Sequence, residues 1–171
     1  MTGLLRLILP GLGIALVTFV AALHWGLGAE SRFLMPFLPA AAIHAAAVAH
    51  PASVPVWLVF SAGLAFDVMT HGPLGYWALI YIACHALALV SPAANDAPLV
   101  VRWLVFAVTL ALLAALEALL SLIYFGHVGD GALLVRAVAG VALAYPFFAL
   151  VVAALPPAAD AARNARLERG A

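Results

Sequence analysis

The chain has 171 residues, of which 68% are hydrophobic and 8% are charged, and its mean hydropathy is +1.20. Soluble domains are about half apolar and about a quarter charged, so this composition excludes an ordinary soluble domain and indicates a membrane protein. The net charge is zero, which gives no indication of a nucleic-acid partner. The single cysteine, Cys84, excludes an intrachain disulfide.

The chain contains six apolar runs, separated by prolines, glycines and short polar clusters. A helix that crosses about 30 Å of hydrocarbon needs roughly 20 apolar residues. The runs therefore predict six transmembrane helices, at residues 4–27, 33–49, 54–69, 74–90, 99–125 and 132–155. We expect a single all-α transmembrane domain over residues 1–157, followed by a short basic cytoplasmic tail over residues 158–171 that is either solvated or lies on anionic lipid.

Small residues and prolines lie inside several of these runs. Ala41, Ala45 and Ala49 recur every four residues, which suits close helix packing, although an alanine-rich composition explains the spacing equally well. Internal prolines are tolerated in membrane helices because neighbouring helices satisfy the freed carbonyl groups. Such prolines are Pro10, Pro36, Pro39 and Pro146.

The arginines predict the orientation of the chain, because cytoplasmic loops of membrane proteins carry an excess of basic residues. If the N-terminus is cytoplasmic, that side holds Arg6, Arg102, Arg163, Arg166 and Arg169. The opposite side then holds Arg32 and Arg136. Both termini are therefore expected in the cytoplasm. The first run also imitates a signal peptide, but its apolar character continues to Leu27, which favours a retained helix.

The most informative segment is Gly63 to Gly75, where Asp67 lies near the end of an apolar run. A carboxylate within the membrane is costly and is by default a functional hypothesis. The turn that follows contains Pro73, Leu74 and Gly75, and it predicts that two membrane helices pack back to back as a hairpin. Gly63 lies one helical turn before Asp67, on the same face, and leaves room for a neighbouring helix.

Three charged residues share roughly one depth in this arrangement. Glu117 follows Arg102 by about 15 residues, or about 22 Å of helix, which places it in the outer half of the membrane. Arg136 lies about one turn into the sixth run from the outer side. We therefore expect a buried polar cluster of Asp67, Glu117 and Arg136; alternatively, Asp67 and Arg136 reach interfacial water.

Chemical motifs of enzymes are absent from the sequence. There is no phosphate-binding loop, nucleophile elbow or zinc-binding His-Glu-x-x-His, so neither catalysis nor a cofactor is expected. His44 and His85 lie within apolar runs but lack the spacing of metal ligands, and a proton relay through them would have to cross the whole membrane. The tryptophans lie near the ends of predicted helices and fit interfacial anchors: Trp25, Trp57, Trp77 and Trp103.

The hairpin segment resembles the signature of MreD, the rod shape-determining membrane protein family of bacteria. The matching residues are Gly63-Leu64, Asp67 and Pro73-Leu74-Gly75. Chain length, six predicted helices, an acidic residue in the fifth (Glu117) and Tyr145-Pro146 in the sixth also agree. The chain departs from the family at residues 46–51, where it keeps the proline but lacks the aromatic residues and the arginine.

The resemblance implies a non-catalytic scaffold of the bacterial inner membrane that binds MreC, a bitopic protein. It also implies that the chain works together with MreB, RodA and the transpeptidase partner of RodA in the machinery that inserts side-wall peptidoglycan. The family fold is similar to the substrate-binding subunits of ECF transporters. On this interpretation the transmembrane helix of MreC packs on small-residue faces of this chain's helices. Gly63 and Asp67 then organise the outer end of those faces.

A different function remains open from the residues alone. Glu117, His44 and His85 within the membrane also suit a substrate-binding membrane subunit or a transporter for a small molecule. A membrane-embedded enzyme is the third alternative and has little support.

Overall fold

A computed structural model describes residues 2–23, 29–91 and 97–154. These residues form six α-helices and one short 3₁₀ helix: α1 (Thr2–Ala22), α2 (Ala29–Ala49), η1 (Pro51–Ser53), α3 (Val56–Thr70), α4 (Tyr76–Leu89), α5 (Leu99–Phe125) and α6 (Gly131–Ala153). The expected all-α class is confirmed for the described residues, and the helices coincide with the six predicted runs to within a few residues. The end of the first run and the basic tail lie outside the described residues.

Turn chemistry explains where the predicted boundaries were slightly wrong. α3 begins at Val56 because Pro55 adopts an extended conformation at its N-cap, with φ −71° and ψ 148°. α4 begins at Tyr76 because Gly75 is left-handed, with φ 91°, a conformation that favours glycine. At the start of α6, the carboxylate of Asp130 accepts the backbone N–H of Ala132 at 2.8 Å, as a side-chain N-cap.

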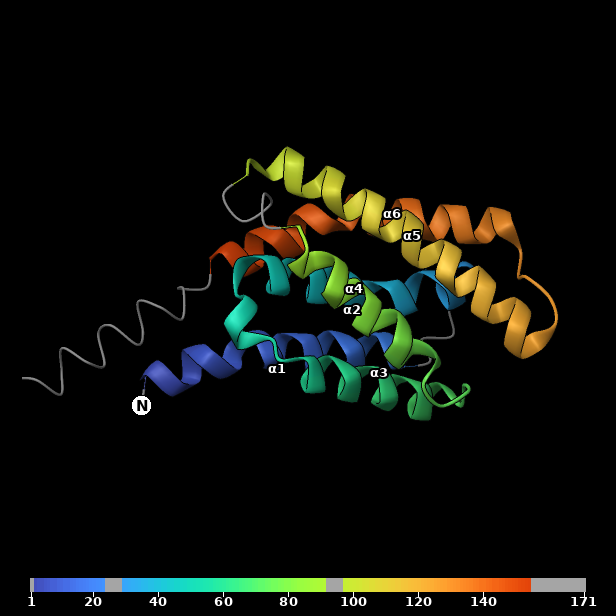
Figure 1. Ribbon diagram of the computed structural model, residues 1–171, viewed down its shortest axis with the longest axis horizontal. Helices are drawn as coiled ribbons and strands as arrows, with labels where there is room; N and C mark the ends of the chain where they lie inside the picture. The colour runs from blue at the N-terminus through green and yellow to red at the C-terminus, as the bar shows by residue number, and fades with distance from the viewer. Residues whose placement is uncertain (1, 24–28, 92–96, 155–171) are drawn as a thin grey trace, which may run out of the picture.

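The helices are stacked in three tiers (Figure 1). α1 and α3 form one outer tier, α2 and α4 lie in the middle, and α5 and α6 form the other outer tier. Within this stack α2 packs against α1, α4 and α6, while α3 packs against α4 and α1, and α5 packs against α4 and α6. The two middle helices supply half of the buried hydrophobic residues of the described part of the chain.

α2 is buried along most of its length. Every residue from Ala40 to Val48 is buried, and Ala49 is half-buried. Because three helices surround α2, its small side chains allow close approach on every side. Ala41 and Ala45 are buried, but so is every residue between them and Ala49 is only half-buried, so the burial does not distinguish a packing stripe from an alanine-rich composition.

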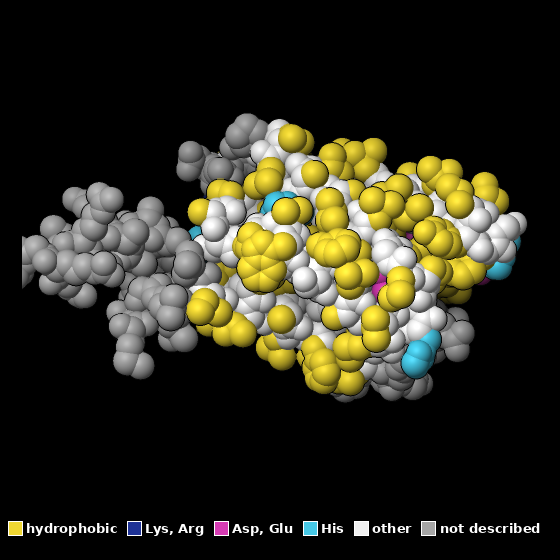
Figure 2. All heavy atoms as spheres, turned by 60° about the horizontal axis from the view of Figure 1, so that its bottom comes forward, with side chains coloured by type: hydrophobic (Ala, Val, Ile, Leu, Met, Phe, Trp, Pro, Cys, Tyr) yellow, Lys and Arg dark blue, Asp and Glu magenta, His cyan; other side chains and the backbone are white. Residues whose placement is uncertain are grey.

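Large apolar side chains cover the outer surface of the bundle (Figure 2). Examples are Leu16 on α1, Trp57 on α3 and Leu143 on α6, which are 63%, 67% and 75% exposed. Soluble proteins rarely expose apolar patches of such extent. By length and composition α5 and α6 could each cross a membrane, whereas the apolar parts of the other four described helices are shorter.

A side-chain N–H group satisfies a carbonyl that a proline has freed. Pro146 has no N–H for the carbonyl of Ala142, and the indole N–H of Trp103 on α5 donates to that oxygen at 2.7 Å. This bond ties α5 to α6, as expected for a proline in a membrane helix. The Nε2–H of His50 donates to the carbonyl of Val152 at 3.3 Å and ties the end of α2 to the last turn of α6.

Candidate functional site

The carboxylate of Asp67 joins the two helices of the hairpin. Asp67 lies in the last turn of α3 and is fully buried. Its Oδ2 accepts the backbone N–H of Gly75 at 2.8 Å, and its Oδ1 accepts the backbone N–H of Trp77 at 2.9 Å. The first N–H groups of a helix lack acceptors within the helix, and they favour a nearby negative charge. Asp67 therefore caps α4 from the preceding helix.

The main chain of Asp67 also shapes the turn. Its carbonyl accepts the N–H of Gly72 at 3.0 Å. His71, the C-cap of α3, is left-handed, with φ 56° and ψ 30°, and directs its N–H back to the last turn of α3. Asp67 therefore accepts hydrogen bonds at the end of α3 through its main-chain carbonyl and at the start of α4 through its side chain.

Gly63 allows the two helices to touch. A Cβ atom at Gly63 would lie 2.6 Å from the backbone nitrogen of Ala78 on α4, and its contact with the Ala78 Cα would be closer still. No side chain larger than hydrogen fits at that distance without a shift of backbone. The expected room for a neighbouring helix is confirmed, but α4 of the same chain occupies it, so Gly63 offers no surface to a partner.

The remaining motif residues shape the turn. The carbonyl of Pro73 accepts the N–H of Tyr76 at 3.1 Å. Leu64 is half-buried, and Leu74 is 69% exposed. The predicted hairpin is thus confirmed, with Leu74 as its exposed apolar tip.

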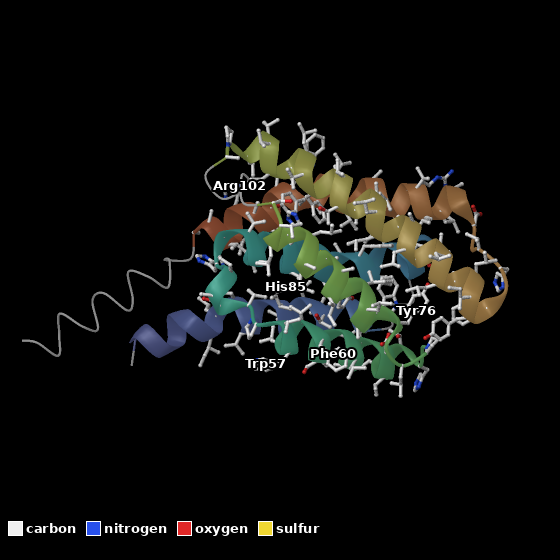
Figure 3. All side chains as sticks on the ribbon, in the orientation of Figure 1. Trp57, Phe60, Tyr76, His85 and Arg102 are labelled. Carbon is white, nitrogen blue, oxygen red and sulfur yellow. The ribbon has the colours of Figure 1, made fainter. Side chains whose placement is uncertain are left out.

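Tyr76 connects the hairpin to α5. It is the first residue of α4 and lies between α4 and α5 (Figure 3). Its hydroxyl donates to the main-chain carbonyl of Glu117 at 3.1 Å and faces the Glu117 Oε1 at 3.2 Å. The rings of Tyr124 and Phe125 also pack around Tyr76, with centroid distances of 5.9 and 6.2 Å. Asp67 and Glu117 therefore both contact the start of α4.

Arg136 does not share the buried environment of Asp67. It is exposed on α6, whereas Asp67 is fully buried and Glu117 is half-buried. The expectation that Arg136 is buried with the two acids is therefore wrong. The reason is the rotation of α6 about its own axis, which directs other residues near its start, such as Ala137, towards the core.

A second polar centre was not expected from the sequence. His44 on α2 is fully buried, and its Nδ1 lies 3.0 Å from the hydroxyl of Tyr145 on α6. The Tyr145 ring stacks on Phe106 at 4.2 Å, and the Nε2 of His44 has no hydrogen-bond partner among the described residues. The only signal in the sequence was the presence of His44 within an apolar run.

Across residues 2–23, 29–91 and 97–154, no three His, Cys, Asp or Glu side chains gather where they could hold a metal ion. No family model matches the chain, and neither a curated protein nor a solved structure matches it.

Proposed function

We propose that this chain is a non-catalytic scaffold of the bacterial inner membrane that binds an MreC-like bitopic protein, as the resemblance to MreD implies. One observation carries the proposal: Gly63, Asp67 and Gly75 each have a separate role in a single hairpin. The residues that make up the resemblance therefore form one structural unit. The proposed scaffold interacts with MreB, RodA and the transpeptidase partner of RodA, either directly or through the MreC-like protein.

The proposed scaffold crosses the membrane six times, with both termini in the cytoplasm. Exposed large apolar residues on α1, α3 and α4, as well as on α5 and α6, support lipid contact for the shorter helices too. The distribution of arginines supports the orientation. A fold like that of ECF substrate-binding subunits remains an expectation of the resemblance.

The partner helix would bind an exposed face of the bundle. Helices associate in lipid through close packing and hydrogen bonds, and the hairpin interior is already filled. α3 presents Trp57 and Phe60, which are 67% and 43% exposed, along its outer edge (Figure 3). On this proposal Asp67 acts indirectly, by holding α3 and α4 in the arrangement that presents this edge.

Co-purification in detergent tests the proposal. The tagged chain is expected to capture the MreC-like protein of the same organism. Trp57→Ala combined with Phe60→Ala should weaken capture, whereas Leu143→Ala, at an exposed apolar position on α6, is the control. No capture by a well-folded native chain would refute the scaffold. Loss of capture in the Leu143→Ala variant alone would show that the docking face is on α6.

The second candidate is a membrane subunit that binds a small molecule. The buried Nε2 of His44, which has no partner among the described residues, favours it because buried polar atoms are normally hydrogen-bonded. Genomic neighbourhood separates the two candidates: an adjacent MreC-like coding sequence supports the scaffold, and an adjacent energising ATPase supports the binding subunit.

A further inference from the structure

The α3–α4 hairpin is much shorter than the helices beside it. α3 has 15 residues and α4 has 14, whereas α6 has 23 and α5 has 27. At 1.5 Å per residue these lengths are about 22, 21, 34 and 40 Å. The hydrocarbon core of a bilayer is about 30 Å thick, so the hairpin is too short for it and the α5–α6 pair is not.

Hydrogen bonds connect α2 to α6 and α4 to the start of the hairpin on the side that the proposal places in the cytoplasm. His50, directly after α2, donates to the carbonyl of Val152 near the end of α6 at 3.3 Å. η1 leads from there into α3. His85, in the last turns of α4, donates to the carbonyl of Val54, just before α3, at 2.9 Å. The hairpin and α6 are therefore tied together near this end, and a difference in their reach is expected at the opposite end.

The outer ends differ by about the expected amount. Tyr76, at the outer end of α4, contacts Glu117, and α5 then continues for eight more residues to Phe125, or about 12 Å. The lengths of α6 and α3 also differ by about 12 Å. In Figure 1 the connection between α5 and α6 extends beyond the turn between α3 and α4.

The chemistry of the two outer ends requires different surroundings. The projecting end of α5 exposes Leu119, Leu122 and Ile123, by 54%, 50% and 67%, which suits hydrocarbon. The hairpin turn contains non-helical backbone and the exposed side chains of His71 and Leu74. Irregular backbone does not occur where it faces lipid tails, because its polar groups would lack partners. The turn therefore suits the lipid headgroup region, at a level where α5 needs hydrocarbon.

We propose that the bilayer around this protein is not uniform in thickness. The outer leaflet is thinned beside α3 and α4 and keeps its full thickness beside α5 and α6. Headgroups descend to the turn at His71, while acyl chains continue to cover Ile123. Bilayers adapt in this way to short hydrophobic segments at modest energetic cost. This inference rests on the six-span arrangement proposed above.

Cysteine accessibility in right-side-out membrane vesicles tests the inference. His71→Cys, His127→Cys and Ile123→Cys are made singly in the full chain and treated with a charged, membrane-impermeant maleimide. Cys84 is fully buried, so the native chain supplies the background rate. His71→Cys and His127→Cys should react at similar rates, and Ile123→Cys should react about tenfold more slowly, because the charged reagent does not enter hydrocarbon.

Each other pattern overturns the inference in a different way. Protection of His71→Cys would place the turn in hydrocarbon. Rapid reaction of Ile123→Cys would place the end of α5 in water beside a uniformly thin bilayer. Reaction of His71→Cys and His127→Cys from opposite sides of the vesicle would instead refute the six-span arrangement. Unchanged gel-filtration profiles and helical circular dichroism confirm that the variants fold.

Discussion

The backbone of Ala78 on α4 passes directly against Gly63 on α3, so that a Cβ atom at position 63 would lie 2.6 Å from the Ala78 nitrogen. This contact sets the distance between the two helices of the hairpin. It also explains why glycine stands one turn before Asp67: the helices must approach closely for the carboxylate to reach the start of α4.

Gly63→Ala is expected to destabilise the protein, because the added methyl group forces the two backbones apart. Overpacking of this kind costs about 1–3 kcal/mol. Gly13→Ala is the matched control, since a Cβ atom at that exposed glycine of α1 meets nothing within 4 Å. Thermal unfolding in detergent should show a lowered midpoint for Gly63→Ala and an unchanged or raised midpoint for Gly13→Ala. Equal midpoints would refute the contact.

Asp67→Ala should expose the start of α4 to local unfolding. The substitution leaves the N–H groups of Gly75 and Trp77 without their acceptor, and a buried unsatisfied donor costs about 1–3 kcal/mol. Hydrogen exchange should accelerate at these two amides in particular. Asp67→Asn keeps one acceptor oxygen and should show an intermediate effect. Unchanged exchange at Trp77 in Asp67→Ala would contradict the capping role.

Tyr76→Phe should loosen α5 from the hairpin, because it removes the hydroxyl that donates to Glu117 while the ring is kept. Net contributions of such hydrogen bonds are about 0.5–1.5 kcal/mol. A double-mutant cycle with Glu117→Ala, which removes the side-chain acceptor, separates the side-chain contact from the bond to the main chain. If the two substitutions add without coupling, the hydroxyl is bonded to the carbonyl of Glu117 alone.

Trp103→Phe should cost more stability when Pro146 is present than when it is replaced. The indole N–H donates to the Ala142 carbonyl that Pro146 leaves without a helical partner. Pro146→Ala restores an N–H to that carbonyl. Trp103→Phe is therefore expected to lower the unfolding free energy by about 1 kcal/mol more in the native background than in Pro146→Ala. An equal effect in both backgrounds would mean that Trp103 contributes by packing only.

The elements of this fold could be predicted because apolar runs and their interruptions are local features. Pro55, Gly75 and Gly126 stand at or beside helix ends, and each has a backbone conformation that explains the boundary. The importance of Asp67 was also predictable, since a carboxylate is costly within an apolar run. Its partners were not predictable, because they are backbone amides eight and ten residues further along the chain.

The sequence by itself determined that the chain is helical and apolar, where its helices lie to within a few residues, and that the third and fourth form a hairpin. Only the tertiary structure decided that Gly63 faces Ala78, that Glu117 meets Tyr76 and that Arg136 is exposed. The physical reason is that these helices are apolar on nearly every side. A helix without a distinct polar face gives no indication of its rotation about its own axis, and that rotation decides which side chains meet.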